Sequence, residues 1–86
     1  SHRSEADIVD SCRSGDRSAF NQLVRLHQER VYWVVRRMIH DHDDALDVTQ
    51  EVFIKAYDKF DSFRGDAQIF TWLYRIAANN AKNYLA

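Results

Sequence analysis

The chain has 86 residues and a mass of 10.2 kDa, enough for one small domain. With 45% hydrophobic and 29% charged residues, its composition is typical of a folded soluble protein rather than a disordered or membrane-spanning one. The net charge of −1 divides into +2 over residues 1–40, −5 over 41–61 and +2 over 62–86. This separation indicates one basic and one anionic partner, unless the charges only solvate helix faces.

Two glycines, no proline and one cysteine narrow the possible classes further. So few turn residues argue against several strands and predict an all-α fold. A lone Cys12 cannot form an internal disulfide, and no signal-peptide pattern precedes it, so we expect a cytoplasmic protein. No nucleophile, base and acid combine into a catalytic group, and no phosphate-binding loop is present. We therefore expect no enzymatic activity, no cofactor and no membrane contact.

The first predicted element is a short helix. Ser4 followed by Asp7 resembles a capping box, and Gly15 supplies the stop. Ser1 and His2 resemble a remnant of a purification tag, so we leave them out of the functional argument.

A long second helix is predicted to open near residues 16–18. Its apolar side chains follow the spacing of one buried stripe, with His27 among them. A lone histidine on such a stripe is more often a partly buried, hydrogen-bonded side chain than a metal ligand. The stripe comprises Phe20, Leu23, Val24, Val31, Val34, Val35 and Met38.

The run from His40 to Asp44 separates the second helix from the third. Its histidines and aspartates could hold a metal, but adjacent residues on a short turn rarely converge on one ion, so we expect no metal site. Asp43 or Asp44 is the better candidate for the N-cap of a helix over residues 45–60.

This third helix carries two apolar faces. The inward stripe is predicted to comprise Ala45, Val48, Val52, Ala56 and Phe60. A second set, Leu46, Gln50, Phe53, Ile54 and Tyr57, is bordered by the acids Asp47, Glu51 and Asp58. One stripe is enough to dock a helix, so the second predicts a protein-binding surface. The alternative is a helix buried on two sides. If the surface is real, we expect Asp47, Gln50, Glu51, Phe53, Ile54 and Tyr57 to be exposed.

A turn over residues 61–66 leads into a fourth helix from about Gln68 to the last residue. Gly65 breaks the third helix and Asp66 can cap the fourth. Its expected core stripe is Phe70, Leu73, Ile76, Ala77, Ala81 and Tyr84. The opposite face carries Trp72, Arg75, Asn79, Lys82 and Asn83, which suit base stacking, phosphate contact and base-edge recognition. The pattern continues to the end without a C-cap, so we expect a domain cut from a longer, two-domain protein.

Two motifs carry a family resemblance. Residues 47–53 read Asp-Val-x-Gln-Glu-x-Phe, and residues 71–79 read Thr-Trp-Leu-x-Arg-Ile-Ala-x-Asn, with Phe63-Arg-Gly between them. In this order they resemble region two of bacterial sigma factors, in particular the extracytoplasmic-function (ECF) group. The resemblance runs from about residue 6 to residue 86. It implies a compact bundle of three main helices plus a short N-terminal one.

The resemblance implies a transcription initiation domain that binds core RNA polymerase and recognises and melts the promoter minus-ten element. In such domains the third helix meets the clamp coiled coil of the largest polymerase subunit. Carried over to this sequence, the polymerase contacts are Asp44, Asp47, Gln50, Glu51, Phe53, Ile54 and Tyr57. Leu46 departs from the family, which often has an acid there. An anti-sigma protein is a further partner known for many relatives, and the sequence does not decide whether this chain has one.

In this family the loop before the last helix captures a base flipped from the non-template strand. The DNA-contacting residues implied here are Phe63, Arg64, Asp66, Phe70, Thr71, Trp72, Tyr74, Arg75, Asn79, Asn80, Lys82 and Asn83. Among these, the rings would stack on bases, the amides would pair with base edges and the cations would neutralise phosphates. The family's minus-thirty-five-reading domain has no counterpart in these 86 residues. The alternative function is a helical adaptor that binds protein only.

Overall fold

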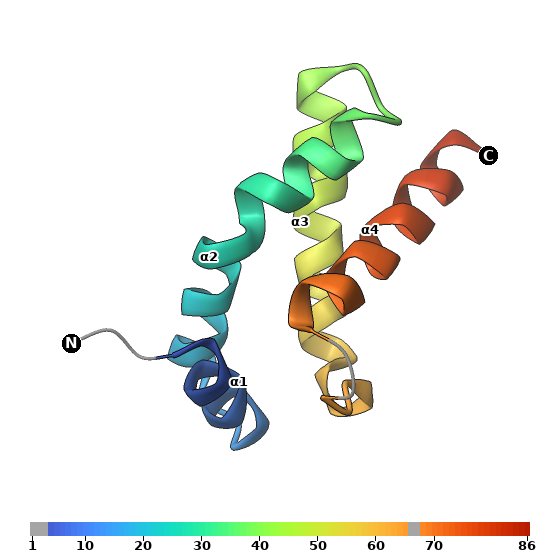
Figure 1. The fold of residues 1–86 in the computed structure, drawn as a ribbon. Helices are drawn as coiled ribbons and strands as arrows, with labels where there is room; N and C mark the ends of the chain where they lie inside the picture. The colour runs from blue at the N-terminus through green and yellow to red at the C-terminus, as the bar shows by residue number, and fades with distance from the viewer. Residues whose placement is uncertain (1–3, 66–67) are drawn as a thin grey trace.

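The computed structural model describes residues 4–65 and 68–86. These residues form α1 (Glu5–Arg13), α2 (Arg17–Arg36), α3 (His42–Asp58), the short 3-10 helix η1 (Phe60–Ser62) and α4 (Ile69–Leu85), with no strand among them. In Figure 1, α1 folds back against the start of α2, while α3 and α4 run beside each other and α2 leans against both. The predicted all-α bundle, with one short and three main helices, is confirmed.

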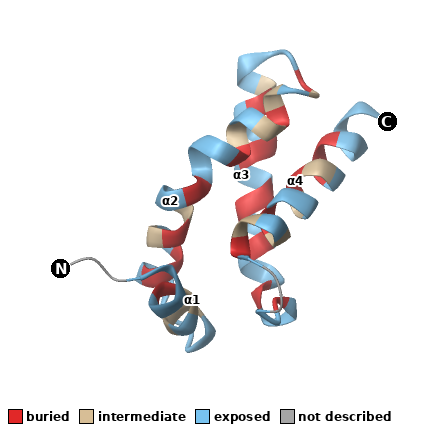
Figure 2. Cartoon of the chain, in the orientation of Figure 1, coloured by how far each residue is buried: buried red, intermediate tan, exposed pale blue. Residues whose placement is uncertain are grey.

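The core lies where α2, α3 and α4 meet. Its completely buried large side chains include Leu23 and Val35 of α2, Val52 of α3 and Leu73 of α4. Figure 2 shows buried residues along the sides of the helices that face one another. Of the predicted members, Val24, Val34, Met38, Phe70 and Ile76 are only partly buried and pack around this centre. Ile39 and Ile69 are buried members that the sequence stripes omitted.

The prediction that Tyr84 belongs to the core is wrong. Its side chain is 48% exposed, because the last turn of α4 runs beyond the region that the other helices cover. Its hydroxyl is instead influenced by the acids at the start of α3. The Asp44 carboxylate raises the pKa of Tyr84 above its usual value by interaction with the hydroxyl, and desolvation and the negative charges of Asp44, Asp41 and Asp47 act in the same direction.

The predicted helix starts are confirmed for α1 and α2. The Ser4 hydroxyl accepts a hydrogen bond from the backbone N–H of Asp7 at 3.2 Å. The Asp16 carboxylate accepts one from the N–H of Ser18 at 2.9 Å. Between the two helices Gly15 has a φ of 89°, a left-handed conformation that suits glycine and lets the chain reverse direction.

The predicted cap of α3 is wrong, because Asp41 rather than Asp43 or Asp44 caps this helix. Its carboxylate accepts a hydrogen bond from the N–H of Asp44 at 2.9 Å, so α3 begins at His42. Asp43 and Asp44 then occupy the first turn, where negative charge is favourable next to the helix dipole. At the other end α3 stops at Asp58, and Phe60 begins η1 rather than ending α3.

This geometry makes a first prediction. Asp41→Ala should lower the free energy of unfolding by about 1 kcal/mol, because it removes the acceptor for the N–H of Asp44. Asp43→Ala removes the same charge without removing the cap and should cost less. Urea denaturation followed by circular dichroism measures both. Equal losses for the two variants would show that charge near the dipole matters here and the cap does not.

His27 is buried in α2, as predicted, but its surroundings differ from the expectation. Its Nε2 lies 3.4 Å from a carboxylate oxygen of Glu5 in α1, an ion-pair distance without hydrogen-bond geometry. The imidazole stacks on Phe70 of α4, with ring centroids 6.0 Å apart. His27 thus connects α1, α2 and α4 through packing. No three His, Cys, Asp or Glu side chains within residues 4–65 and 68–86 gather around a common point that could hold a metal ion.

None of the helices in the described part of the chain is long and apolar enough to cross a membrane.

Candidate functional site

The outward face of α3 combines acids with apolar side chains. Ile54, with 62% of its surface exposed, is the most exposed large hydrophobic residue among those described. Leu46 and Tyr57 are also exposed. The expected exposure is confirmed for Asp47, Gln50, Glu51, Ile54 and Tyr57. Apolar side chains held in water beside carboxylates are the composition expected of a surface that binds a basic, partly apolar partner.

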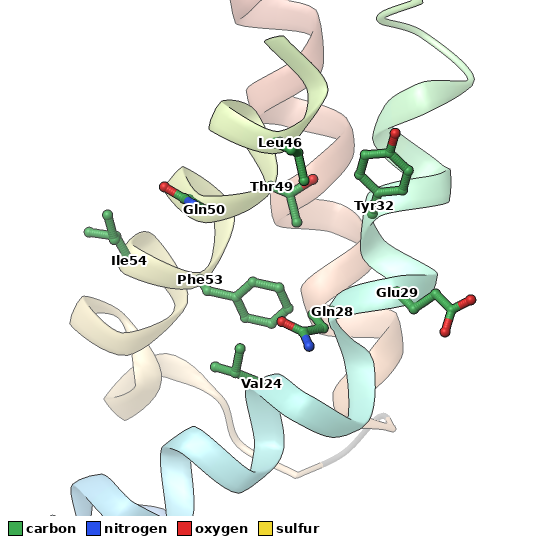
Figure 3. Close-up of a pocket in the computed structure, with 9 residues that line it drawn as sticks. All are labelled: Val24, Gln28, Glu29, Tyr32, Leu46, Thr49, Gln50, Phe53 and Ile54. Carbon is green, nitrogen blue, oxygen red and sulfur yellow. The ribbon is translucent and has the colours of Figure 1, made fainter. Parts of the chain in front are cut away.

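Phe53 departs from this expectation, since only 8% of its surface is exposed. Figure 3 shows its ring pointing from α3 towards α2, in the direction of Val24 and Gln28. Phe53 follows Val52 at the edge of the core, and its ring points into the space between the two helices. The prediction of an exposed Phe53 is therefore wrong. Its ring lies next to the exposed face of α3 and does not project into solvent.

An apolar groove of about 590 Å³ runs between α2 and α3 (Figure 3). On the α3 side it is lined by Leu46, Thr49, Gln50, Phe53 and Ile54, and on the α2 side by Val24, Gln28, Glu29 and Tyr32. The α2 side was not among the predicted contacts, although Val24, Gln28 and Tyr32 recur at four-residue spacing and so share one helix face. The groove and the exposed face of α3 together form one continuous surface.

Tyr57 stands at the far end of this surface and is held in place. Its hydroxyl accepts a hydrogen bond from Arg17 Nε at 3.1 Å. Its ring meets Phe20 edge to face, with centroids 5.1 Å apart. Tyr57 is therefore presented in a fixed orientation, and Arg17 adds a positive charge at the edge of an otherwise acidic face.

Three aromatic rings pack together where residues 60–63 meet α4. Phe63 lies 5.4 Å from Trp72 and 6.0 Å from Phe60, measured between ring centroids, and Phe60 and Trp72 meet edge to face. Phe63 is buried and Trp72 half-buried, so Phe63 does not offer the free ring that the sequence suggested. The proposed cap residue Asp66 lies outside the described residues. Arg64 is exposed next to the cluster.

The outward face of α4 carries most of the polar side chains expected there. Those exposed are Thr71, Tyr74, Arg75, Asn79, Lys82 and Asn83. Asn80 is a correction: it is buried, and its Oδ1 accepts a hydrogen bond from Lys55 Nζ at 2.9 Å. It follows Leu73 by seven residues, which returns it to the buried stripe. That spacing was visible in the sequence and could have excluded Asn80 from the exposed amides.

Phe70 lies on the side of α4 that faces α2, and Tyr74 follows one turn later. The Arg30 guanidinium of α2 sits 3.8 Å from the centroid of the Phe70 ring, a close cation–π contact. The Tyr74 ring lies 6.3 Å from that of Phe70. Phe70 is thus covered by Arg30 on α2, a residue absent from the predicted set, whereas Tyr74 is exposed.

Residues 23–86 match the Sigma-70 region 2 family. This chain belongs to that family. It is 53% identical over 78 residues to the ECF RNA polymerase sigma-E factor of Escherichia coli, covering 91% of this chain and 40% of that protein. It is 46% identical over 81 residues to the RNA polymerase sigma-H factor of Pseudomonas aeruginosa, covering 94% of this chain and 42% of that protein. The chain thus spans about two fifths of these relatives.

One solved structure agrees over almost the whole chain. It is the complex of an engineered region 2 of sigmaE with GTAAAA, which is 46% identical and superimposes with a TM-score of 0.86. The match covers 96% of this chain and 90% of that one. The predicted resemblance to sigma region two is therefore confirmed for both sequence and fold.

Proposed function

We propose that this domain binds core RNA polymerase through α3 and recognises and melts the promoter minus-ten element through α4 and the loop over residues 63–65. The observation that carries the proposal is the presence of two exposed faces with different chemistry on neighbouring helices. The α3 face is acidic and apolar, and the α4 face carries cations, amides and a partly exposed indole. Both activities belong in the cytoplasm and neither needs catalytic chemistry.

The polymerase contact is supported by the charges and shape of the α3 surface. Asp47 and Glu51 are exposed one turn apart and would attract a basic partner. Ile54 and the groove beside it offer apolar area that a helix pair, such as the largest-subunit clamp coiled coil, would cover. Asp44 is half-buried and acts on the pKa of Tyr84, so we place it at the margin of this contact.

The DNA contact is supported by side chains that match the needs of a melted strand. Arg64, Arg75 and Lys82 can neutralise phosphates. Asn79 and Asn83 can pair with base edges, and the exposed part of Trp72 can stack on a base. Flipping a base out of the duplex costs a few kcal/mol of unstacking, so a surface that recovers this cost for one base couples recognition to melting.

Two substitutions on α4 test the DNA contact. Asn79→Ala should relax the preference at one base, because it removes an amide that pairs with a base edge, and should leave the salt dependence almost unchanged. Lys82→Ala should weaken all sequences alike and reduce the salt slope by about 0.7, the value for one contact to a single strand. Fluorescence anisotropy with single-stranded oligonucleotides based on GTAAAA, titrated at several salt concentrations, measures both effects.

The same titrations separate the alternative function. If neither variant changes oligonucleotide binding or promoter opening, the α4 face does not read DNA. The remaining candidate would then be an adaptor that uses only the α3 surface. An anti-sigma protein that competed with polymerase for α3 would be compatible with both functions, the DNA-reading domain and the adaptor.

A further inference from the structure

Arg13, the last residue of α1, reaches across to the loop before α4. Its Nη2 donates a hydrogen bond to the backbone carbonyl oxygen of Phe63 at 2.9 Å, linking residues fifty positions apart. Its guanidinium carbon lies 5.7 Å from the centroid of the Phe63 ring. Nη2 is also so close to Gly65 that a Cβ there would approach it to 3.2 Å. One side chain therefore contacts the loop at both of these residues.

The helix that carries Arg13 is itself fixed to the bundle. Ile8 of α1 is buried in the common core, and Glu5 lies beside His27 of α2. A cavity of about 500 Å³ separates other parts of α1 from the loop, with Val9 and Arg13 on one wall and Phe63 and Gly65 on the other. Arg13 thus bridges a space into which the loop could otherwise shift.

Phe63 is held from two sides. Arg13 holds its carbonyl oxygen, and Trp72 of α4 packs against its ring. The aromatic contact fixes the Phe63 side chain, but rotation of the backbone could still change the direction of the Arg64 side chain and the position of Gly65. A hydrogen bond to the carbonyl removes that freedom. Because the Arg13 guanidinium is already engaged with Phe63, it is poorly placed to bind a phosphate.

We infer that Arg13 is a positioning residue for the loop that reads the minus-ten element. The inference rests on the proposed function and extends it to α1, which lies outside residues 23–86 that match the family. Holding the loop in one conformation before DNA arrives reduces the ordering cost of binding, and it confines the gain to the base whose shape fits. Arg13 therefore acts on base preference and not on general affinity.

The test compares Arg13→Gln with Arg17→Gln as a matched control. Both variants lose one cation that contacts an aromatic ring, and Arg17 contacts Tyr57 on α3 instead of the loop. Anisotropy titrations use single-stranded oligonucleotides in which each position of GTAAAA is varied in turn. For Arg13→Gln, the affinity ratio between the best and worst base should fall by about fivefold at one position, the effect of losing roughly one hydrogen bond. Arg17→Gln should keep the ratio, and Arg13→Lys should restore part of it.

A second readout follows the loop without DNA. In Arg13→Gln the backbone amide resonances of Phe63, Arg64 and Gly65 should move or broaden, whereas in Arg17→Gln they should stay in place.

Three results would overturn the inference. Uniform weakening of all sequences with a smaller salt slope would make Arg13 a phosphate contact. A lower melting temperature with unchanged base preference and unchanged loop resonances would make its role purely structural. If the unmodified chain shows no base preference, the proposed function fails and the reading role of Arg13 falls with it. The loop resonances would still show separately whether Arg13 holds the loop.

Discussion

Replacing Leu73 by alanine should lower the free energy of unfolding by about 2–5 kcal/mol. Leu73 is completely buried on α4 where that helix meets α2 and α3. Removing its isobutyl group loses the transfer free energy of the buried atoms and leaves a cavity that the surrounding helices fill only partly. Urea denaturation monitored by circular dichroism and by tryptophan fluorescence measures the loss.

Leu85→Ala is the matched control for this prediction. It makes the same change on the same helix, at a side chain that is 56% exposed, and should shift the free energy of unfolding by no more than about 0.5 kcal/mol. A loss below about 1 kcal/mol for Leu73→Ala would mean that the α4 register described above is wrong.

Replacing Ile54 by alanine should weaken binding to core RNA polymerase by about thirtyfold, which corresponds to roughly 2 kcal/mol. Ile54 projects from the centre of the α3 surface, beside the groove and between the two acids and Tyr57. An apolar side chain covered at the middle of an interface is where binding energy concentrates. Competition with a labelled sigma factor for core polymerase measures the loss.

Leu26→Ala is the control for the polymerase prediction. Leu26 is 53% exposed on α2 and does not line the groove, so its removal should leave polymerase binding unchanged. Both variants should keep the stability of the unmodified chain, because neither side chain is buried. Phe53→Ala is unsuitable for this purpose, since Phe53 is buried and its loss would destabilise the fold. Equal binding by the Ile54 and Leu26 variants would place the polymerase contact away from α3.

The sequence predicted the helices well because each buries a periodic stripe, and periodicity depends only on the order of residues. The sequence predicted less well which residues of the other helices cover each apolar stripe. Phe53 lies at the edge of its stripe, and its ring is buried because it points towards Val24 and Gln28 on α2. Tyr84 continues the stripe of α4 past the end of the helices that could cover it.

The candidate site shows the same limit. The acids and Ile54 could be placed on one face of α3 from their spacing alone. The α2 wall of the groove and the contact from Arg13 join residues far apart in the chain, and no local pattern encodes such pairs. Among three nearby aspartates, the choice of Asp41 as the cap of α3 depends on backbone angles at the turn, which a list of favourable cap residues does not determine.

The aromatic cluster of Phe60, Phe63 and Trp72 anchors the loop at its base and leaves Arg64 outside it. Gly65 next to it has a φ of 80°, so that position remains restricted to glycine, whereas Arg64 can be exchanged without disturbing the core. A substitution at Arg64 therefore changes the charge beside the cluster while the domain keeps its fold. Stability and the surface charge of the loop depend on different side chains here, so the charge can change without loss of the fold.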